Sequence, residues 1–227
     1  MIALVTGTGK GIGRALALDL VSLGYTVVFH YRSTPPPTIP QQCLAAQADL
    51  TVVAEVQRLF ETIDTRYGVL DVLINTVGNL GSYQTLTETT LEEFDDVMDT
   101  NVRATWLCLH YGVPLLRHST AGRVINFGCA TADQVLARKY TVPYYIAKAG
   151  VITLTKSWAE LLAPAGITVN AISPGIVANS KIQQSLPMGR PASFKDIQQA
   201  VRWLLSPAAS YVSGANLEIS GGWVPQH

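Results

Sequence analysis

A glycine-rich turn close to the start of the chain constrains the fold more than any other feature. The turn occupies residues 6–13 and reads TGTGKGIG; it follows an apolar run at residues 2–5 and precedes a stretch with helical spacing of apolar residues from Ile12 onward. Gly7 lets the backbone leave the strand sharply, and Gly11 and Gly13 let a ligand and the helix approach without an intervening Cβ. Because the free N–H groups at a helix start attract phosphate, this order of strand, turn and helix predicts a dinucleotide-binding site.

Composition excludes several classes of partner. The chain has 227 residues, of which 48% are hydrophobic and 14% charged, and its formal net charge is zero. We therefore expect one α/β domain over residues 1–227 that binds a small molecule. We expect it to bind neither nucleic acid nor a membrane surface. No apolar run approaches the ~20 residues that span a bilayer. Cys43, Cys108 and Cys129 are too far apart in sequence for a metal or disulfide motif, so we expect no metal and a cytoplasmic location.

Strand-like and helix-like segments alternate along the whole chain. Apolar runs predict strands at 2–5, 26–31, 44–48, 69–75, 123–127, 167–172 and 216–219. Helical spacing predicts helices after the glycine turn and at 51–67, 90–117, 143–162 and 193–205, with a loop at 176–192 that should cover the substrate. Thr90 and Glu93 have the spacing of a capping box. The alternation predicts a doubly wound parallel sheet of the Rossmann type, with about seven strands and helices on both faces.

The residues at the end of the second predicted strand bear on the choice of cofactor. An acidic residue there suits the adenosine ribose of NAD, whereas a basic one suits the 2′-phosphate of NADP. This chain has Arg32 and Ser33 at that point, and Lys10 lies within the glycine turn. The charges favour NADP(H).

The order of motifs resembles the short-chain dehydrogenase/reductase family over almost the whole chain. The matching motifs are Thr6-Gly7 with Gly11 and Gly13, Asp49-Leu50, Asn75 to Gly78, Asn101, the strand 123–127, Tyr144 with Lys148, Asn170, Pro174-Gly175 and Ser220-Gly221-Gly222-Trp223. The resemblance implies a seven-stranded Rossmann sheet and NAD(P)-dependent oxidoreduction of a carbonyl or alcohol. The segment 30–33, HYRS, is similar to that of NADPH-dependent pteridine reductases and 3-oxoacyl-carrier-protein reductases.

The resemblance also implies roles for individual residues. Tyr144 is the general acid, Lys148 four positions later lowers the pKa of Tyr144 and holds the nicotinamide ribose, and Asn101 holds a water in the proton relay. Hydride transfer to a carbonyl leaves negative charge on oxygen, which is why such an acid is needed. The expected cofactor-binding residues are Gly7, Lys10, Gly11, Ile12, Gly13, Arg32, Ser33, Asp49, Leu50, Asn75, Gly78, Tyr144, Lys148, Pro174 and Gly175.

One position departs from the family pattern and leaves two questions open. The catalytic serine of the family falls on Cys129, whose thiol is a weaker hydrogen-bond donor. The segment from there to Tyr144 is about two residues longer than the family's, so Thr131 or Asp133 could fill the role instead. The alternative function is a catalytically weakened NADP(H)-binding sensor or a subunit of a larger assembly.

The family is commonly tetrameric, so we expect a homo-oligomer, either a tetramer or a dimer. The helices at 90–117 and 143–162 would form the interfaces. Trp106 and Trp158 lie on these helices and are either interface or core residues.

Overall fold

The computed structural model describes residues 1–180 and 185–224 and contains one seven-stranded sheet. Its strands are β1 (Ile2–Val5), β2 (Thr26–Tyr31), β3 (Leu44–Gln47), β4 (Val72–Asn75), β5 (Arg123–Phe127), β6 (Thr168–Pro174) and β7 (Asn216–Ile219). They lie in the order β3-β2-β1-β4-β5-β6-β7, and every neighbouring pair is parallel. The predicted doubly wound sheet is confirmed. Part of the predicted loop 176–192, residues 181–184, lies outside the described residues.

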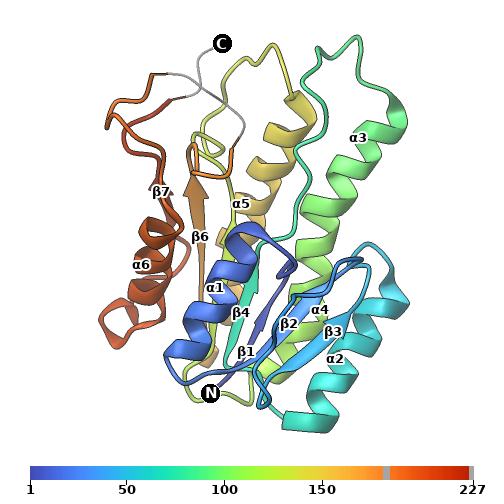
Figure 1. Cartoon of the computed structure of the whole chain (residues 1–227), viewed down its shortest axis with the longest axis vertical. Helices are drawn as coiled ribbons and strands as arrows, with labels where there is room; N and C mark the ends of the chain where they lie inside the picture. Colours follow the sequence, from blue (N-terminus) through green and yellow to red (C-terminus); the bar gives the residue numbers. More distant parts are fainter. Residues whose placement is uncertain (181–184, 225–227) are drawn as a thin grey trace.

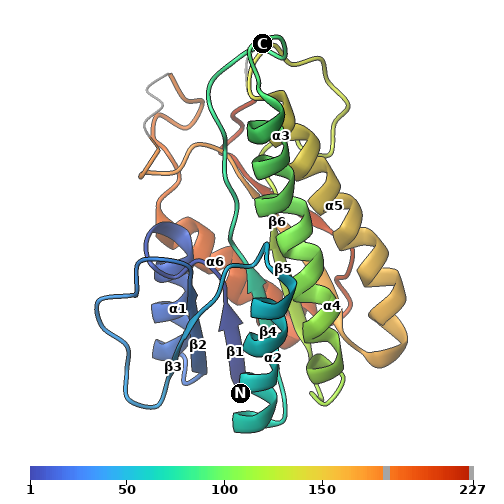
Figure 2. The same cartoon turned by 90° about the vertical axis from the view of Figure 1, so that its right-hand side faces the viewer.

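Helices cover both faces of this sheet. They are α1 (Gly11–Ser22), α2 (Val53–Tyr67), α3 (Leu91–Met98), α4 (Ala104–Leu116), α5 (Val142–Leu162) and α6 (Phe194–Leu205). Helices α1 and α6 lie on one face, and α2, α4 and α5 lie on the other (Figure 2). Burial on both faces explains why the central strands are continuous apolar runs rather than alternating ones.

Glycines follow the ends of two of these helices, and a polar side chain caps the start of a third. Gly24 follows α1 with φ +87° and Gly68 caps α2 with φ +66°, a left-handed backbone that glycine adopts without strain. Thr90 caps α3 by accepting a bond from the Glu93 N–H at 3.2 Å. The Glu93 carboxylate, however, accepts from the N–H of Ser82 instead of returning to Thr90, so only half of the predicted capping box is correct.

The long helix predicted at 90–117 is interrupted. A π-helical segment, Asp99–Arg103, separates α3 from α4 and contains Asn101. The Asn101 Nδ2 donates to the Val97 carbonyl oxygen at 2.9 Å, which uses an acceptor of the helix itself. Single-turn π segments within α-helices are frequent at functional sites.

The strand order reverses direction between β1 and β4. The chain winds outward from β1 through β2 to β3, then returns and winds the other way from β4 to β7. A crevice opens at the carboxyl ends of strands where the order reverses, because the loops from the two strands part in opposite directions. Figure 1 shows β1 and β4 side by side, with their following loops at the same end of the sheet.

Candidate functional site

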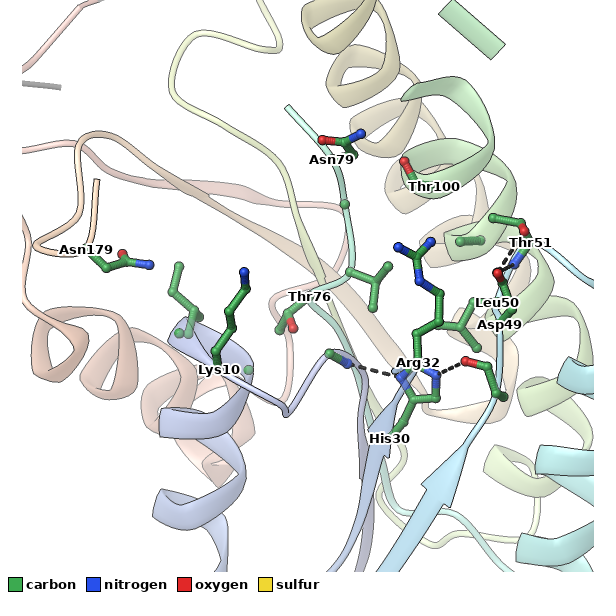
Figure 3. Close-up of a pocket in the computed structure, with 18 of the residues that line it drawn as sticks. Lys10, His30, Arg32, Asp49, Leu50, Thr51, Thr76, Asn79, Thr100 and Asn179 are labelled. Carbon is green, nitrogen blue, oxygen red and sulfur yellow. Dashed lines mark hydrogen bonds between the residues drawn. The ribbon is translucent and has the colours of Figure 1, made fainter. Parts of the chain in front are cut away.

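A cavity of about 800 Å³ lies at this reversal point (Figure 3). Residues from the turn after β1, the ends of β2 and β3 and the segment after β4 line it. It brings together nine of the predicted cofactor-binding residues: Gly7, Lys10, Gly11, Ile12, Gly13, Arg32, Asp49, Leu50 and Gly78. Ser33 is exposed and is not among the described residues that line this cavity.

The glycines of the turn create the space that a dinucleotide needs. Gly7 and Gly11 have φ values of +71° and +60°. A Cβ added to Gly13 would lie 2.5 Å from the Gly7 carbonyl oxygen, so α1 starts in direct contact with the turn. The first N–H groups of α1 therefore lie beside a turn that has no side chains of its own at Gly7, Gly11 and Gly13, which fits a pyrophosphate group.

Two cations and one carboxylate lie around the cavity. Figure 3 shows Lys10, which immediately precedes α1, and Arg32, which immediately follows β2, beside the cavity. Burial alone raises the pKa of Asp49, but hydrogen bonds from the Thr51 N–H and hydroxyl, together with the charge of Arg32, outweigh it and lower that pKa. Asp49 is thus a carboxylate at neutral pH, and the described residues place no carboxylate within ion-pair distance of Arg32.

His30 anchors the glycine turn to the sheet. The side chain is 1% exposed, its Nδ1 accepts from the Gly7 N–H at 3.1 Å, and its Nε2 donates to the Ala48 carbonyl oxygen at 2.9 Å. The His30 carbonyl oxygen also accepts from the N–H and hydroxyl of Thr8 at 2.8 and 2.9 Å. Burial lowers the pKa of His30 to about 4, so the ring is neutral, as an acceptor nitrogen requires. Sequence reasoning assigned it no site role, although a histidine in a buried strand needs polar partners.

A second cavity of about 260 Å³ adjoins the first. Ile12, Thr76, Gly78 and Asn179 line both. Five further predicted site residues line the second cavity: Cys129, Tyr144, Lys148, Pro174 and Gly175. Asn179 was missed by sequence reasoning, since its position four residues after Gly175 carries no motif that composition or periodicity shows.

Tyr144, Cys129 and Lys148 form one cluster in this second cavity. Tyr144 packs against Cys129, and both side chains line the cavity. The Lys148 Nζ lies 5.6 Å from the centroid of the Tyr144 ring and donates to the Phe127 carbonyl oxygen at 2.8 Å. Helical spacing of four residues on α5 places both side chains on one face.

The pKa values of this cluster differ from the sequence expectation. Lys148 was predicted to lower the pKa of Tyr144, whereas burial raises the pKa of Tyr144 well above 10. Burial also lowers the pKa of Lys148 to about 8, so its ammonium group loses a proton more readily than that of an exposed lysine. Burial raises the pKa of the Cys129 thiol to about 11. At neutral pH the cluster thus contains a neutral phenol, a neutral thiol and an ammonium group.

Asn101 and Lys148 face one point beside Gly78. The Asn101 Nδ2 donates to the Asn79 carbonyl oxygen at 2.8 Å, but its buried Oδ1 has no partner among the described residues. A Cβ built on Gly78 would lie 2.3 Å from that oxygen and 3.1 Å from the Lys148 Nζ. The unpaired acceptor and the ammonium donor thus converge at the junction of the two cavities, where a water could bond to both.

The two residues considered as substitutes for Cys129 point elsewhere. The Thr131 hydroxyl accepts from Arg138, and its N–H donates to the Glu218 carboxylate. The Asp133 carboxylate accepts from the Asn216 amide at 3.1 Å. Of these three candidates, only Cys129 lines the second cavity.

Asn75 lies beneath the site rather than in it. Its side chain is 3% exposed and donates to the Asn126 Oδ1 at 2.9 Å, and the Asn126 amide donates on to the Thr155 hydroxyl. This buried chain of bonds connects β4, β5 and α5. It fixes the strand ends from which the site residues follow.

Comparison with known proteins shows close overall similarity to reductases. A family model described as enoyl-(acyl carrier protein) reductase matches residues 7–224. The 3-oxoacyl-(acyl-carrier-protein) reductase FabG of Staphylococcus aureus is 31% identical over 97% of this chain and 96% of its own. The 3-oxoacyl-(acyl-carrier-protein) reductase of Synechocystis is 32% identical over 98% of this chain and 96% of its own.

Solved structures share the fold along the whole chain. A 3-ketoacyl-(acyl-carrier-protein) reductase from Brucella melitensis, complexed with NADH, has a TM-score of 0.90 at 28% identity and covers 97% of each chain. The ligand-free aldohexose dehydrogenase of Thermoplasma acidophilum has a TM-score of 0.89 at 24% identity, covering 100% of this chain and 96% of its own. Among the described residues, no helix has the length and apolar character needed to cross a membrane.

Proposed function

The chain belongs to the short-chain dehydrogenase/reductase family, and we propose that it is an NADPH-dependent reductase of a small carbonyl compound. Family membership makes it an oxidoreductase that uses a nicotinamide dinucleotide. The preference for NADPH, the substrate and the residue roles are the proposed part. The observation that carries the proposal is the Tyr144, Cys129 and Lys148 cluster beside the glycine-lined cavity.

The two cavities divide the binding of cofactor and substrate. The glycine turn and α1 would hold the pyrophosphate, Asp49 and Leu50 the adenine, and Gly78, Pro174 and Gly175 the nicotinamide end. When bound, the dinucleotide supplies a hydride to the carbonyl carbon of the substrate. The residues of this chain have to orient that carbonyl, stabilise charge on its oxygen and deliver a proton.

Tyr144 is the proposed proton donor. Because burial raises its pKa, the phenol keeps its proton at neutral pH and can give it to the oxygen as negative charge develops there. The Cys129 thiol also keeps its proton and can donate a hydrogen bond to the same oxygen, though a weaker one than a serine would give. Lys148 is an ammonium at neutral pH and would stabilise the phenolate that remains.

Asn101 is proposed to restore the proton on Tyr144. Its unpaired Oδ1 and the Lys148 Nζ face the same point beside Gly78. A water held there would accept a hydrogen bond from the Lys148 ammonium and donate one to the Asn101 Oδ1. It could pass a proton toward Lys148 and Tyr144 after each turnover. The π-helical segment at Asp99–Arg103 contains Asn101, and such segments are frequent at functional sites, which supports this role.

The substrate should be small at its reacting end. The cavity of about 260 Å³ beside Tyr144 is partly lined by Leu80 and Val177, which favours an apolar group next to the carbonyl. Relatives named as 3-oxoacyl-(acyl-carrier-protein) reductases make 3-oxoacyl thioesters the first compounds to test, with simple ketones and dihydropterins beside them.

Steady-state consumption of NADPH against this panel tests the proposal. We expect turnover of at least one carbonyl class by the native chain and none by Tyr144→Phe, which removes only the hydroxyl. The matched control is Tyr211→Phe, because Tyr211 is fully exposed and far along the chain from the site. Undiminished turnover by Tyr144→Phe would overturn the proposed roles.

The alternative of a weakened NADP(H) sensor receives no support from the relatives, which are named as reductases. The same assay covers it, because a sensor would bind NADPH and reduce no compound of the panel. The free, buried state of Cys43, Cys108 and Cys129 is compatible with the proposed cytoplasmic location.

We also propose a homo-oligomer assembled through α4 and α5. Trp106 on α4 is 41% exposed and could lie in such an interface, whereas Trp158 packs against the core beneath α5. Only Trp106 therefore remains a candidate of the two. Light scattering at micromolar concentration tests this point, and a monomeric mass would contradict it.

A further inference from the structure

A third cavity lies outside both cavities of the proposed reductase site. It has a volume of about 340 Å³ and is enclosed by α5 and the segment 131–138 that follows β5. In Figure 2 this segment arches beside the start of α5. Tyr145 forms part of the wall and packs edge-to-face against Tyr144 at 5.9 Å, so the third cavity backs onto the catalytic cluster without opening into it.

Hydrogen bonds hold the loop side of this cavity in place. Thr131 is 1% exposed and has φ +62°, a conformation that is costly for a β-branched residue. Its N–H donates to the Glu218 carboxylate and its hydroxyl accepts from Arg138. One bond goes to β7 and the other lies within the loop, and together they stabilise the strained residue. They therefore hold this wall of the cavity in a defined position.

Arg138 presents a fixed guanidinium group to the cavity. Its Cζ lies 4.0 Å from the centroid of the Tyr145 ring, and one of its nitrogens is bonded to Thr131. A guanidinium group has five N–H donors, so most of them remain for a ligand. Lys156, one turn of α5 beyond Ile152, adds a second positive charge to the lining.

The charges that line the cavity favour an anion. The Glu218 carboxylate, which is not among the lining residues, accepts from the Thr131 N–H and forms no ion pair with Arg138 among the described residues. Asp133 is the single carboxylate among the described lining residues, against the two cations Arg138 and Lys156. Within residues 1–180 and 185–224, neither cation forms an ion pair, and Asp133 is engaged by Asn216. A guanidinium stacked on an aromatic ring and lacking a carboxylate partner is suited to bidentate binding of a planar carboxylate.

The rest of the lining is apolar and small in extent. The apolar part of the lining comes from Leu136, Val142, Ile146, Ala149 and Ile152. The Ile146 residue is 46% exposed in the single chain. The volume is near the lower end of the range for small-molecule sites, which suits a single ring or a short aliphatic chain.

We propose that this cavity binds a small carboxylate with an apolar body, with the carboxylate on Arg138 and the apolar body against α5. The site is separate from the reductase site, and the proposal does not depend on the chain's activity. Ile146, Ala149 and Thr153 belong to α5, the helix through which we also propose that the chain assembles, so the ligand and a partner chain would both approach this helix. The bound ligand would contact Tyr145, which packs against Tyr144.

Calorimetric titration of the full chain with sodium hexanoate, in the presence of saturating NADPH, tests the proposal. Sodium acetate provides the charge without the apolar body, and hexanol provides the apolar body without the charge. We expect saturable binding of hexanoate and at least about tenfold weaker binding of each partial probe. Equal binding of acetate or of hexanol, or no saturable binding of hexanoate, would overturn the proposal.

Three variants locate the binding. Arg138→Met removes the charge but keeps an apolar stem, and we expect it to weaken hexanoate by about tenfold or more. Ala149→Leu fills the cavity and should abolish binding while leaving both cations in place, whereas Lys195→Met on α6 removes an exposed charge elsewhere and should change nothing. Unchanged NADPH affinity establishes that each variant is folded. Hexanoate binding that survives Ala149→Leu or Arg138→Met would place the ligand elsewhere, for example beside Lys148, and would refute the site.

Discussion

The Nδ1 of His30 accepts a hydrogen bond from the Gly7 N–H at 3.1 Å, and this bond connects the second strand to the turn on which a pyrophosphate would rest. The opposite ring nitrogen donates to Ala48 at the end of β3. One side chain thus joins three neighbouring segments at the floor of the larger cavity. We infer that it positions the glycine turn.

Two substitutions separate the two bonds of His30. In His30→Asn the Oδ1 can still accept from Gly7, whereas in His30→Gln the Nε2 can still donate to Ala48 but the bond to Gly7 is lost. Since a hydrogen bond contributes about 0.5–1.5 kcal/mol, we expect His30→Gln to weaken NADPH binding by about three- to tenfold more than His30→Asn. Fluorescence titration with NADPH measures the difference. Equal losses in the two variants would mean that His30 matters only for folding.

The buried histidine should also make the fold sensitive to acid. His30 has a folded pKa of about 4, below its ordinary value of 6.5, so the unfolded chain binds a proton more readily than the folded chain. Its contribution to stability is complete above about pH 6.5 and is lost as the pH falls toward 4, by about 3 kcal/mol in total. Asp49 is the charged neighbour and opposes part of this effect by favouring the protonated ring. Urea unfolding at a series of pH values measures it, and His30→Asn should have a flatter profile between pH 6.5 and 4.

Cofactor preference should depend on Arg32. Lys10 and Arg32 both line the larger cavity and are exposed, so each can reach a 2′-phosphate. A charge-assisted hydrogen bond contributes about 1.5–3 kcal/mol, which corresponds to tenfold or more in affinity. We expect Arg32→Met to weaken NADPH by about tenfold and to leave NADH nearly unchanged. Arg58→Met, on the exposed surface of α2, is the matched control. A wild-type chain that binds NADH as tightly as NADPH would contradict the expectation.

The sequence predicted the strands of the sheet, and it predicted nine residues that line the larger cavity, because both depend on local patterns. Apolar runs and glycines at helix ends mark β1, β2, Gly24 and Gly68 without reference to distant residues. The glycine turn likewise carries its own signature. These features follow from backbone conformation and burial, which adjacent residues largely determine.

Features that depend on distant partners could not be predicted in this way. Glu93 has the spacing of a capping box, but the Ser82 N–H from the preceding loop competes for its carboxylate. The raised pKa of Tyr144 comes from burial by surrounding elements, which a spacing of four residues to Lys148 does not reveal. Asn179 reaches the site only because the loop after β6 returns to within 3.4 Å of a Cβ built on Gly11.

The thiol of Cys129 should limit the rate of the proposed reaction. It lines the smaller cavity, and Tyr144 packs against it. A serine hydroxyl is the stronger donor to a developing oxyanion. Removing one such donor costs about 2.7–4 kcal/mol in sites that depend on it, so improving a weak donor should gain less, about tenfold in turnover. We therefore expect Cys129→Ser to be faster than the native chain and Cys129→Ala to be slower.

Thr131 and Asp133 provide the comparison for Cys129, because their side chains are engaged by Arg138 and Asn216 and do not line the smaller cavity. Thr131→Ser keeps the hydroxyl that Arg138 uses, and Asp133→Asn keeps an oxygen for the Asn216 amide, so neither should change turnover by more than about twofold. Turnover at saturating NADPH measures all four variants, and their NADPH affinities establish that they are folded. If Cys129→Ser and Cys129→Ala were both neutral, the sulfur would be only a packed apolar atom. If Asp133→Asn were instead strongly damaging, the loop would have to rearrange on substrate binding and bring its carboxylate to the carbonyl in place of the thiol.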